Sequence, residues 1–110
     1  MRKDIQINTF LPYSDFVEKM ILTKGQFRLA ENALGLTGEA GEVAEKIKKV
    51  FRDGTYDAAG VQKELGDVIF YWVALHNALG LNPVDTINMN VDKLTSRKQN
   101  GTLNGEGDNR

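Results

Sequence analysis

The sequence predicts an all-α protein of four helices in a single domain, and three observations support this expectation. Apolar residues recur every three to four positions over four segments, a spacing typical of amphipathic helices. Short breaks that contain glycine or proline separate these segments. The 110 residues suffice for one domain, residues 1–110, with a modest core.

The composition is that of an ordinary globular protein, with 41% hydrophobic residues, 26% charged residues and a net charge of -1. A net charge so close to zero gives no reason to expect binding to nucleic acid or to a membrane surface. The chain has no cysteine, which excludes disulfides and thiolate metal sites. No apolar run reaches about 18 residues, and residues 1–10 do not resemble a signal peptide, so we expect a cytoplasmic protein without a membrane partner.

The first helix is expected at residues 14–22, where Ser14 is a suitable N-cap and the following apolar residues repeat at helical spacing. Residues 23–25 form a break, and the second helix is expected at residues 26–52. This second helix contains three glycines, and each costs about 1 kcal/mol relative to alanine in a helix interior. They indicate either a kink near residues 35–38 or close packing against another helix.

The third helix follows a turn at residues 53–56, has Asp57 as a suitable N-cap and is expected at residues 57–79. Its segment 65–75 is apolar nearly all round, which predicts burial on every side. A lone unit of four helices would not cover such a helix. We therefore expect a homo-oligomer, a dimer or a tetramer, that forms a larger helical bundle.

The fourth helix is expected at residues 84–98. Gly80 is suited to end the preceding helix, and Pro83 lies near the first turn of the new one. Residues 99–110 are rich in glycine and asparagine, so we expect a flexible tail there.

Two pairs of carboxylates, each spaced i, i+3, lie on the second and third helices: Glu39 with Glu42, and Glu64 with Asp67. Residues three apart share one face of a helix, and here that face borders the apolar stripe. Four carboxylates aimed at one volume would resist ionising together. A hard divalent cation such as Mg²⁺ relieves that repulsion, because it takes oxygen ligands. The two pairs therefore predict a metal site made by two helices.

The competing interpretation is that these acids form surface salt bridges with nearby lysines. The lysines concerned are Lys46, Lys48, Lys49 and Lys63. Asp67 argues for the metal, because it interrupts an apolar stretch and a buried carboxylate needs a partner or a metal. Glycines beside the acids would also let two helices approach; they are Gly38, Gly41 and Gly66.

The single histidine, His76, argues against a di-iron bundle site, which needs Glu-x-x-His motifs on two helices. We expect His76 and Trp72 to be core or interface residues. Ligation by oxygen alone favours Mg²⁺ or Mn²⁺. Such ions commonly act on phosphates, where they clamp phosphoryl oxygens and activate water.

Three segments, taken in order, resemble the MazG family of all-α nucleoside triphosphate pyrophosphohydrolases. Residues 35–49 carry Glu-x-x-Glu, residues 63–71 carry Glu-x-x-Asp, and residues 90–97 read Asn-x-x-Lys-Leu-x-x-Arg. The ending at residues 105–110 is similar to the family's as well. The resemblance covers roughly residues 30–110.

The resemblance implies that Glu39, Glu42, Glu64 and Asp67 bind Mg²⁺, with Mn²⁺ as the alternative ion. It implies that a metal-activated water attacks the α-phosphate of a nucleotide, which yields the monophosphate and pyrophosphate. One of Glu39 and Glu42 would serve as general base. The substrates implied are canonical or modified (d)NTPs, and the base and sugar stay open.

The same resemblance provides candidates for substrate binding: Lys49, Tyr71, Asn90, Lys93 and Arg97. A tetra-anionic triphosphate needs cations beyond the metal, and arginine offers a bidentate fork. Tyr71 would pack on the sugar or the base. The alternatives are a solvated helix face for the two lysines and a favourable interaction with the helix dipole for Arg97.

Two other classes of protein compete with the enzyme. One is a non-catalytic helical module that binds nucleotide or metal, or has a regulatory role, and keeps the acids for structure. The other is a nucleic-acid adaptor, and the net charge of -1 without a basic stripe argues against it.

Overall fold

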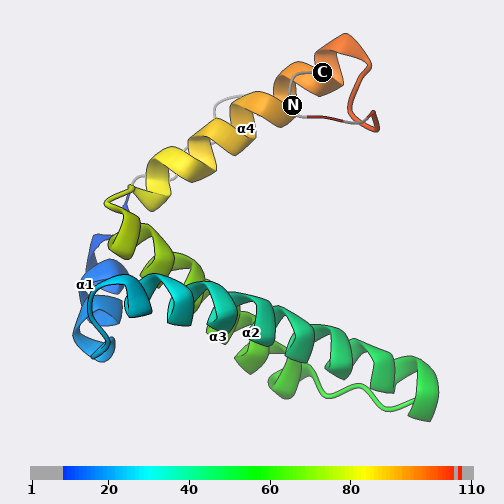
Figure 1. Cartoon of the computed structure of the whole chain (residues 1–110). Coiled ribbons are helices and arrows are strands. Elements are labelled where there is room, and N and C mark those ends of the chain that lie inside the picture. Colours follow the sequence, from blue (N-terminus) through cyan, green and yellow to red (C-terminus); the bar gives the residue numbers. More distant parts are fainter. Residues whose placement is uncertain (1–8, 106, 108–110) are drawn as a thin grey trace.

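The computed structural model describes residues 9–105 and 107. Within them the chain forms four helices and no strand: α1 (Leu11–Met20), α2 (Gln26–Asp53), α3 (Ala58–Leu79) and α4 (Pro83–Asn100). The predicted all-α class is confirmed. Figure 1 shows α2 and α3 side by side, α1 across one end of this pair, and α4 leading away from it. The signal-peptide expectation concerns residues that mostly lie outside the described part.

Helix α1 begins at Leu11, three residues before the predicted start, and ends at Met20. The backbone N–H of Leu11 donates to Thr9 Oγ1 at 3.0 Å. Pro12 occupies the first turn, where the missing N–H of proline costs nothing. Ser14 therefore lies inside the helix, and the prediction that it caps the helix is wrong.

Helix α2 runs from Gln26 to Asp53 without interruption, so its glycines do not end the helix. The alternative of close packing is confirmed at Gly35, where an added Cβ would lie 2.5 Å from the Tyr71 ring. It is wrong for Gly38, Gly41 and Gly66. An added Cβ at these three would meet no described atom within 4 Å.

The ends of α3 agree with the sequence. Asp57 Oδ1 accepts a hydrogen bond from the Gly60 N–H at 2.9 Å, as an N-cap does. Gly80 ends the helix with φ of 69°, in the left-handed region that glycine adopts without steric cost. Both residues confirm their predicted capping roles.

Helix α4 begins at Pro83 and continues to Asn100, two residues beyond the predicted end. Arg97 is buried and donates from Nη2 to the Gly107 carbonyl at 3.1 Å. The first two residues of the predicted tail are therefore helical, and the chain after α4 returns to contact it. Residues 106 and 108–110 of the predicted tail lie outside the described part.

Two contacts fix the antiparallel register of α2 and α3. Asn32 is fully buried, and its Nδ2 donates to the Ala74 carbonyl at 3.4 Å. One turn further along α2 and one turn back along α3, Gly35 lies against the ring of Tyr71. The next turn in the same register brings the two carboxylate motifs face to face.

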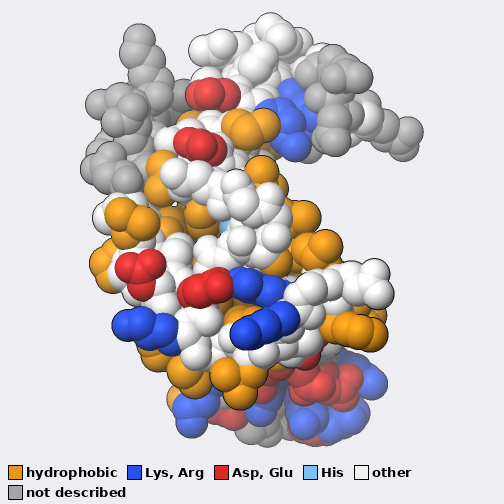
Figure 2. Space-filling model, turned by 60° about the vertical axis from the view of Figure 1, so that its left-hand side comes forward, with side chains coloured by type: hydrophobic (Ala, Val, Ile, Leu, Met, Phe, Trp, Pro, Cys, Tyr) orange, Lys and Arg blue, Asp and Glu red, His pale blue; other side chains and the backbone are white. Residues whose placement is uncertain are grey.

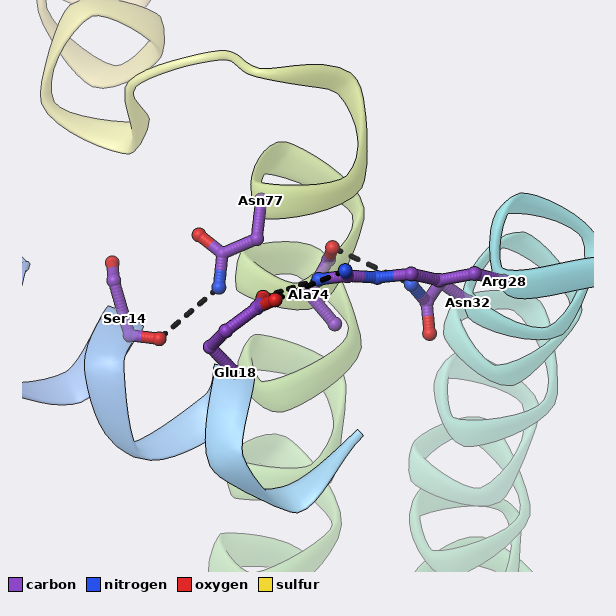
Figure 3. Close-up of polar contacts among 6 residues, drawn as sticks. All are labelled: Ser14, Glu18, Arg28, Asn32, Ala74 and Asn77. Atoms are coloured by element: carbon purple, nitrogen blue, oxygen red, sulfur yellow. Dashed lines mark hydrogen bonds and ion pairs between the residues drawn. The ribbon is translucent and has the colours of Figure 1, made fainter. Parts of the chain in front are cut away.

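Polar contacts attach α1 to α2 and α3 (Figure 3). Glu18 and Arg28 form a bidentate ion pair, in which Nη1 lies 3.0 Å from Oε2. Hydrogen bonds from Arg28 hold the pKa of Glu18 below its ordinary value. Asn77 Nδ2 donates to the Ser14 carbonyl at 3.1 Å. Helix α1 is thereby fixed at the end of the α2–α3 pair.

The core is small for a chain of this length. Its buried residues are Val17, Val73 and Ala74, and partly buried aromatic and aliphatic side chains pack around them. Leu65 and Ile69 on α3 are 52% and 37% exposed, so the single chain does not bury α3 on all sides, and its burial in an oligomer stays a prediction. Figure 2 shows hydrophobic side chains at the surface beside charged ones.

The overall shape is open. The radius of gyration is 16.7 Å, whereas a compact chain of this length has about 13 Å. Among the described elements, the helix pairs that pack extensively are α2 with α3 and α1 with α3, so none of these helices packs extensively on α4. Among the described residues, no helix combines the length and the apolar character needed to cross a membrane.

His76 joins α3 to α4 and is a satisfied core residue, as predicted. Its Nδ1 lies 2.8 Å from the Trp72 carbonyl, and its Nε2 lies 2.7 Å from Thr86 Oγ1. A carbonyl oxygen only accepts, so Nδ1 carries a proton, and in the tautomer with a single ring proton Nε2 accepts from the Thr86 hydroxyl. The Trp72 ring packs on the imidazole with a centroid distance of 4.3 Å.

Thr86→Val is therefore expected to lower the free energy of unfolding by about 1–3 kcal/mol, because it leaves the buried Nε2 of His76 without a donor. Urea unfolding measures the change. Thr37→Val is the matched control, since the Thr37 hydroxyl bonds only to the Ala33 carbonyl of its own helix, 3.2 Å away, on an exposed face. Equal stability of the two variants would contradict the assignment.

Candidate functional site

Three carboxylates meet where α2 faces α3. One oxygen each from Glu39, Glu64 and Asp67 lies within 4.8 Å of the others. Glu39 and Glu64 are half-buried, whereas Asp67 is exposed. Asp67 is therefore not buried in the single chain, which corrects the expectation of a buried carboxylate at this position.

Glu42 does not belong to this group of three and is exposed. It follows Glu39 by three residues on α2, and its negative charge contributes to raising the pKa of Glu39. The structure therefore brings three of the four predicted acids together and leaves the fourth at the edge.

The pKa of Glu39 is raised above its ordinary value. The largest cause is partial burial, followed by a hydrogen bond with Glu64 and by the charges of Asp67, Glu64 and Glu42. A hydrogen bond between two carboxyl groups requires that one of them carries a proton. Without a cation, Glu39 therefore resists ionisation, as expected for a carboxyl group with like charges close by.

Two of the four lysines of the salt-bridge interpretation pair with other acids. Lys46 Nζ lies 3.7 Å from Asp57 Oδ2, and Lys48 Nζ lies 3.9 Å from Glu45 Oε1. Among the described residues, no ion pair includes an acid of the cluster. The three oxygens therefore converge without a neutralising side chain, which is the arrangement that suits a divalent cation.

Tyr71 lies one helical turn beyond Asp67 on α3 and is half-buried. Its ring packs edge-on against Phe70 with a centroid distance of 5.3 Å. The same ring lies over the backbone of Gly35. The sequence indicates Tyr71 but not Gly35 as a site residue, because the register that pairs the two cannot be read from either helix alone.

The cationic and amide candidates lie apart from the carboxylates within one chain. Lys49 is exposed on α2, ten residues after Glu39, which corresponds to about 15 Å along a helix. Asn90 and Lys93 lie on α4 and line a cavity of about 660 Å³ at its surface. Arg97 is buried against the segment that follows α4.

The fold and the site together define an all-α protein with a carboxylate cluster shared by two antiparallel helices. The chain matches the MazG nucleotide pyrophosphohydrolase domain over residues 27–102, a range that includes α2, α3 and α4. It belongs to this family.

The chain is also similar to a curated protein whose name gives no activity. The chain is 43% identical over 82 residues to a protein named "Gene 37 protein" from Mycobacterium phage L5, an alignment that covers 70% of this chain and 72% of the relative. No solved structure matches the chain.

Proposed function

We propose that this protein is a divalent-cation-dependent nucleotide pyrophosphohydrolase that converts a (d)NTP into the (d)NMP and pyrophosphate. Membership of the MazG family supports the class of reaction. The observation that carries the proposal is the convergence of Glu39, Glu64 and Asp67 oxygens within 4.8 Å. An all-oxygen donor set of this kind fits Mg²⁺ or Mn²⁺.

Glu39, Glu64 and Asp67 would hold the ion, and Glu42 would join them from the next turn of α2. When bound, Mg²⁺ supplies charge neutralisation at the phosphate oxygens and a more acidic water. The two acids on α2 are Glu39, which belongs to the cluster, and Glu42, which lies at its edge. One of them would take the proton from the attacking water. Hydrolysis at the α-phosphate then releases pyrophosphate.

A second subunit would complete the pocket. The triphosphate needs cations and hydrogen-bond donors. Lys93 and Arg97 are the cationic candidates on α4, and Asn90 on the same helix offers an amide N–H. In one chain α4 leads away from the α2–α3 pair (Figure 1). The exposed apolar side chains of α3 and the open shape support a homo-oligomer as the source of these missing groups.

The proposed activity is tested with a panel of dNTPs, NTPs and damaged nucleotides at saturating Mg²⁺, with HPLC detection of the products. We expect the monophosphate and pyrophosphate in equal amounts from at least one nucleotide, and no product in excess EDTA. Activity that persists in EDTA would contradict the cation-dependent proposal. Binding without turnover would favour the non-catalytic nucleotide-binding module.

Addition of Mn²⁺ is expected to raise the melting temperature at pH 7. An ion at about 100 times its dissociation constant stabilises the folded state by about 2.7 kcal/mol, which corresponds to a rise of roughly 10 °C. Differential scanning fluorimetry measures the shift. The rise should vanish in Glu39→Gln and remain in Glu45→Gln, which changes an exposed glutamate of the same helix.

The same Glu39→Gln variant is expected to be more stable than the wild type in EDTA. The folded state raises the pKa of Glu39, so it binds the proton more tightly than the unfolded chain does. The wild type therefore loses stability as pH rises from the ordinary pKa of glutamate through the raised value. Urea unfolding between pH 4 and pH 7 should show that the free energy of unfolding of the variant exceeds that of the wild type by an amount that grows with pH. A difference that does not change with pH would contradict repulsion at Glu39.

A further inference from the structure

Gly35 is the glycine of α2 that a described side chain approaches closely. A Cβ at this position would lie 2.5 Å from both Cδ1 and Cε1 of Tyr71 and 2.7 Å from Cζ. Carbon atoms in favourable contact are about 3.5–4.0 Å apart. Any side chain at position 35 would therefore displace the ring, or α3 with it, by about 1 Å.

This contact lies in the turn that precedes the carboxylate cluster on α2. Gly35 is four residues before Glu39, and Tyr71 is four residues after Asp67, so both pairs share a helix face. The Tyr71 ring thus lies between α2 and α3, one helical turn from the three carboxylate oxygens. On the far side of the ring, the buried Asn32 bonds to the Ala74 carbonyl and limits how far the two helices can slide.

We propose that Gly35 is a positioning residue. By carrying no Cβ it seats the Tyr71 ring on the α2 backbone, and this contact sets the distance of Glu39 from Glu64 and Asp67. The inference rests on the proposed role of these acids as ligands. Mg²⁺ demands near-ideal octahedral geometry at 2.0–2.1 Å, and functional groups must be held within about 0.5 Å of it. A shift of about 1 Å one turn away exceeds that tolerance.

Mn²⁺ affinity of the full chain, measured by calorimetry and EPR, tests the proposal without relying on turnover. We expect Gly35→Ala to weaken Mn²⁺ binding by about 10-fold or more. This value is the lower end of the loss in metal affinity that is typical when a group that orients the ligands is removed. Gly41→Ala is the matched control on the same helix, since a Cβ at Gly41 meets nothing described within 4 Å. It should bind Mn²⁺ as the wild type does.

A double-mutant cycle with Tyr71→Ala separates positioning from a general loss of stability. If the ring transmits the effect, adding Gly35→Ala to Tyr71→Ala should change Mn²⁺ affinity by no more than about twofold, the ordinary limit of additivity. An equal loss in both backgrounds would overturn the proposal. So would a lower melting temperature of Gly35→Ala with unchanged Mn²⁺ affinity, because that result shows a structural role alone.

The wild-type protein distinguishes failure of this inference from failure of the proposed function. If the wild type does not bind Mn²⁺, the acids are not ligands and the proposed function fails. If the wild type binds Mn²⁺ and Gly35→Ala binds it equally well, the proposed function stands and the positioning role of Gly35 is refuted.

Discussion

Asp67→Asn is expected to reduce pyrophosphate release by at least about 10³-fold, because it removes a negative ligand from a site whose ion contributes several kcal/mol to the transition state. The substitution keeps the shape of the side chain. Asp67 is exposed and pairs with no described cation, so its neutralisation should not destabilise the fold. Initial rates of pyrophosphate formation and a melting curve of the same sample measure both expectations.

Asp53→Asn is the control for this prediction. Asp53 is an exposed aspartate at the end of α2 that bonds to Arg52 at 2.9 Å, and it takes no part in the cluster. It should retain the wild-type rate. If Asp67→Asn kept the wild-type rate at saturating substrate and Mg²⁺, the carboxylate cluster would not be needed for the reaction. Glu39→Gln and Glu42→Gln in the same assay would show which glutamate of α2 acts on the attacking water.

Paired substitution of Leu65 and Ile69 by glutamate is expected to convert the protein into a monomer and to abolish activity. The two residues lie one turn apart on α3, and their shared face is about 160° around the helix from Asp67. New charges there would have to be desolvated in an interface, which is costly. They do not touch the carboxylates, so a loss of activity would follow from the loss of the partner subunit.

Light scattering coupled to gel filtration measures the assembly at micromolar concentration. The wild type should elute as a dimer or a tetramer, and Lys48→Glu, a charge reversal at an exposed position, should not change it. A wild type that is monomeric and fully active would contradict the oligomer and would mean that α4 folds back onto its own α2–α3 pair in solution.

Local signals in the sequence were sufficient for most helix ends. Asp57 and Gly80 have the side chain and the backbone freedom that their capping positions need, so both could be assigned without a fold. Ser14 was misassigned for the same local reason, since a serine before an apolar run is a strong cap signal. The helix begins earlier because Thr9 and Pro12 together form an alternative start.

The carboxylate cluster could be predicted in part. The i, i+3 spacing places each acid pair on one face of its helix, and this depends only on helix geometry. The register of α2 against α3 depends on long-range contacts such as that of Asn32 with Ala74. Without that register the sequence could not separate Glu42 from the other three acids, nor select Gly35 over Gly38 as the glycine that Tyr71 approaches.

The exposure of Asp67 and the direction of α4 could not be predicted for a related reason. An apolar helix predicts that another element packs on it, but the sequence of the helix does not identify that element. In the single chain the side of α3 that carries Asp67 stays open, and Lys93 lies on a helix that leads elsewhere. Both features depend on packing between helices and, in our proposal, between subunits.

Hydrolysis of a (d)NTP substrate in ¹⁸O-labelled water, with mass spectrometry of the products, tests the central proposal most directly. Attack at the α-phosphate predicts one ¹⁸O in the nucleoside monophosphate and none in the pyrophosphate, with no signal from Asp67→Asn or in EDTA. Release of inorganic phosphate and a nucleoside diphosphate, or a label found in pyrophosphate, would contradict the proposed reaction.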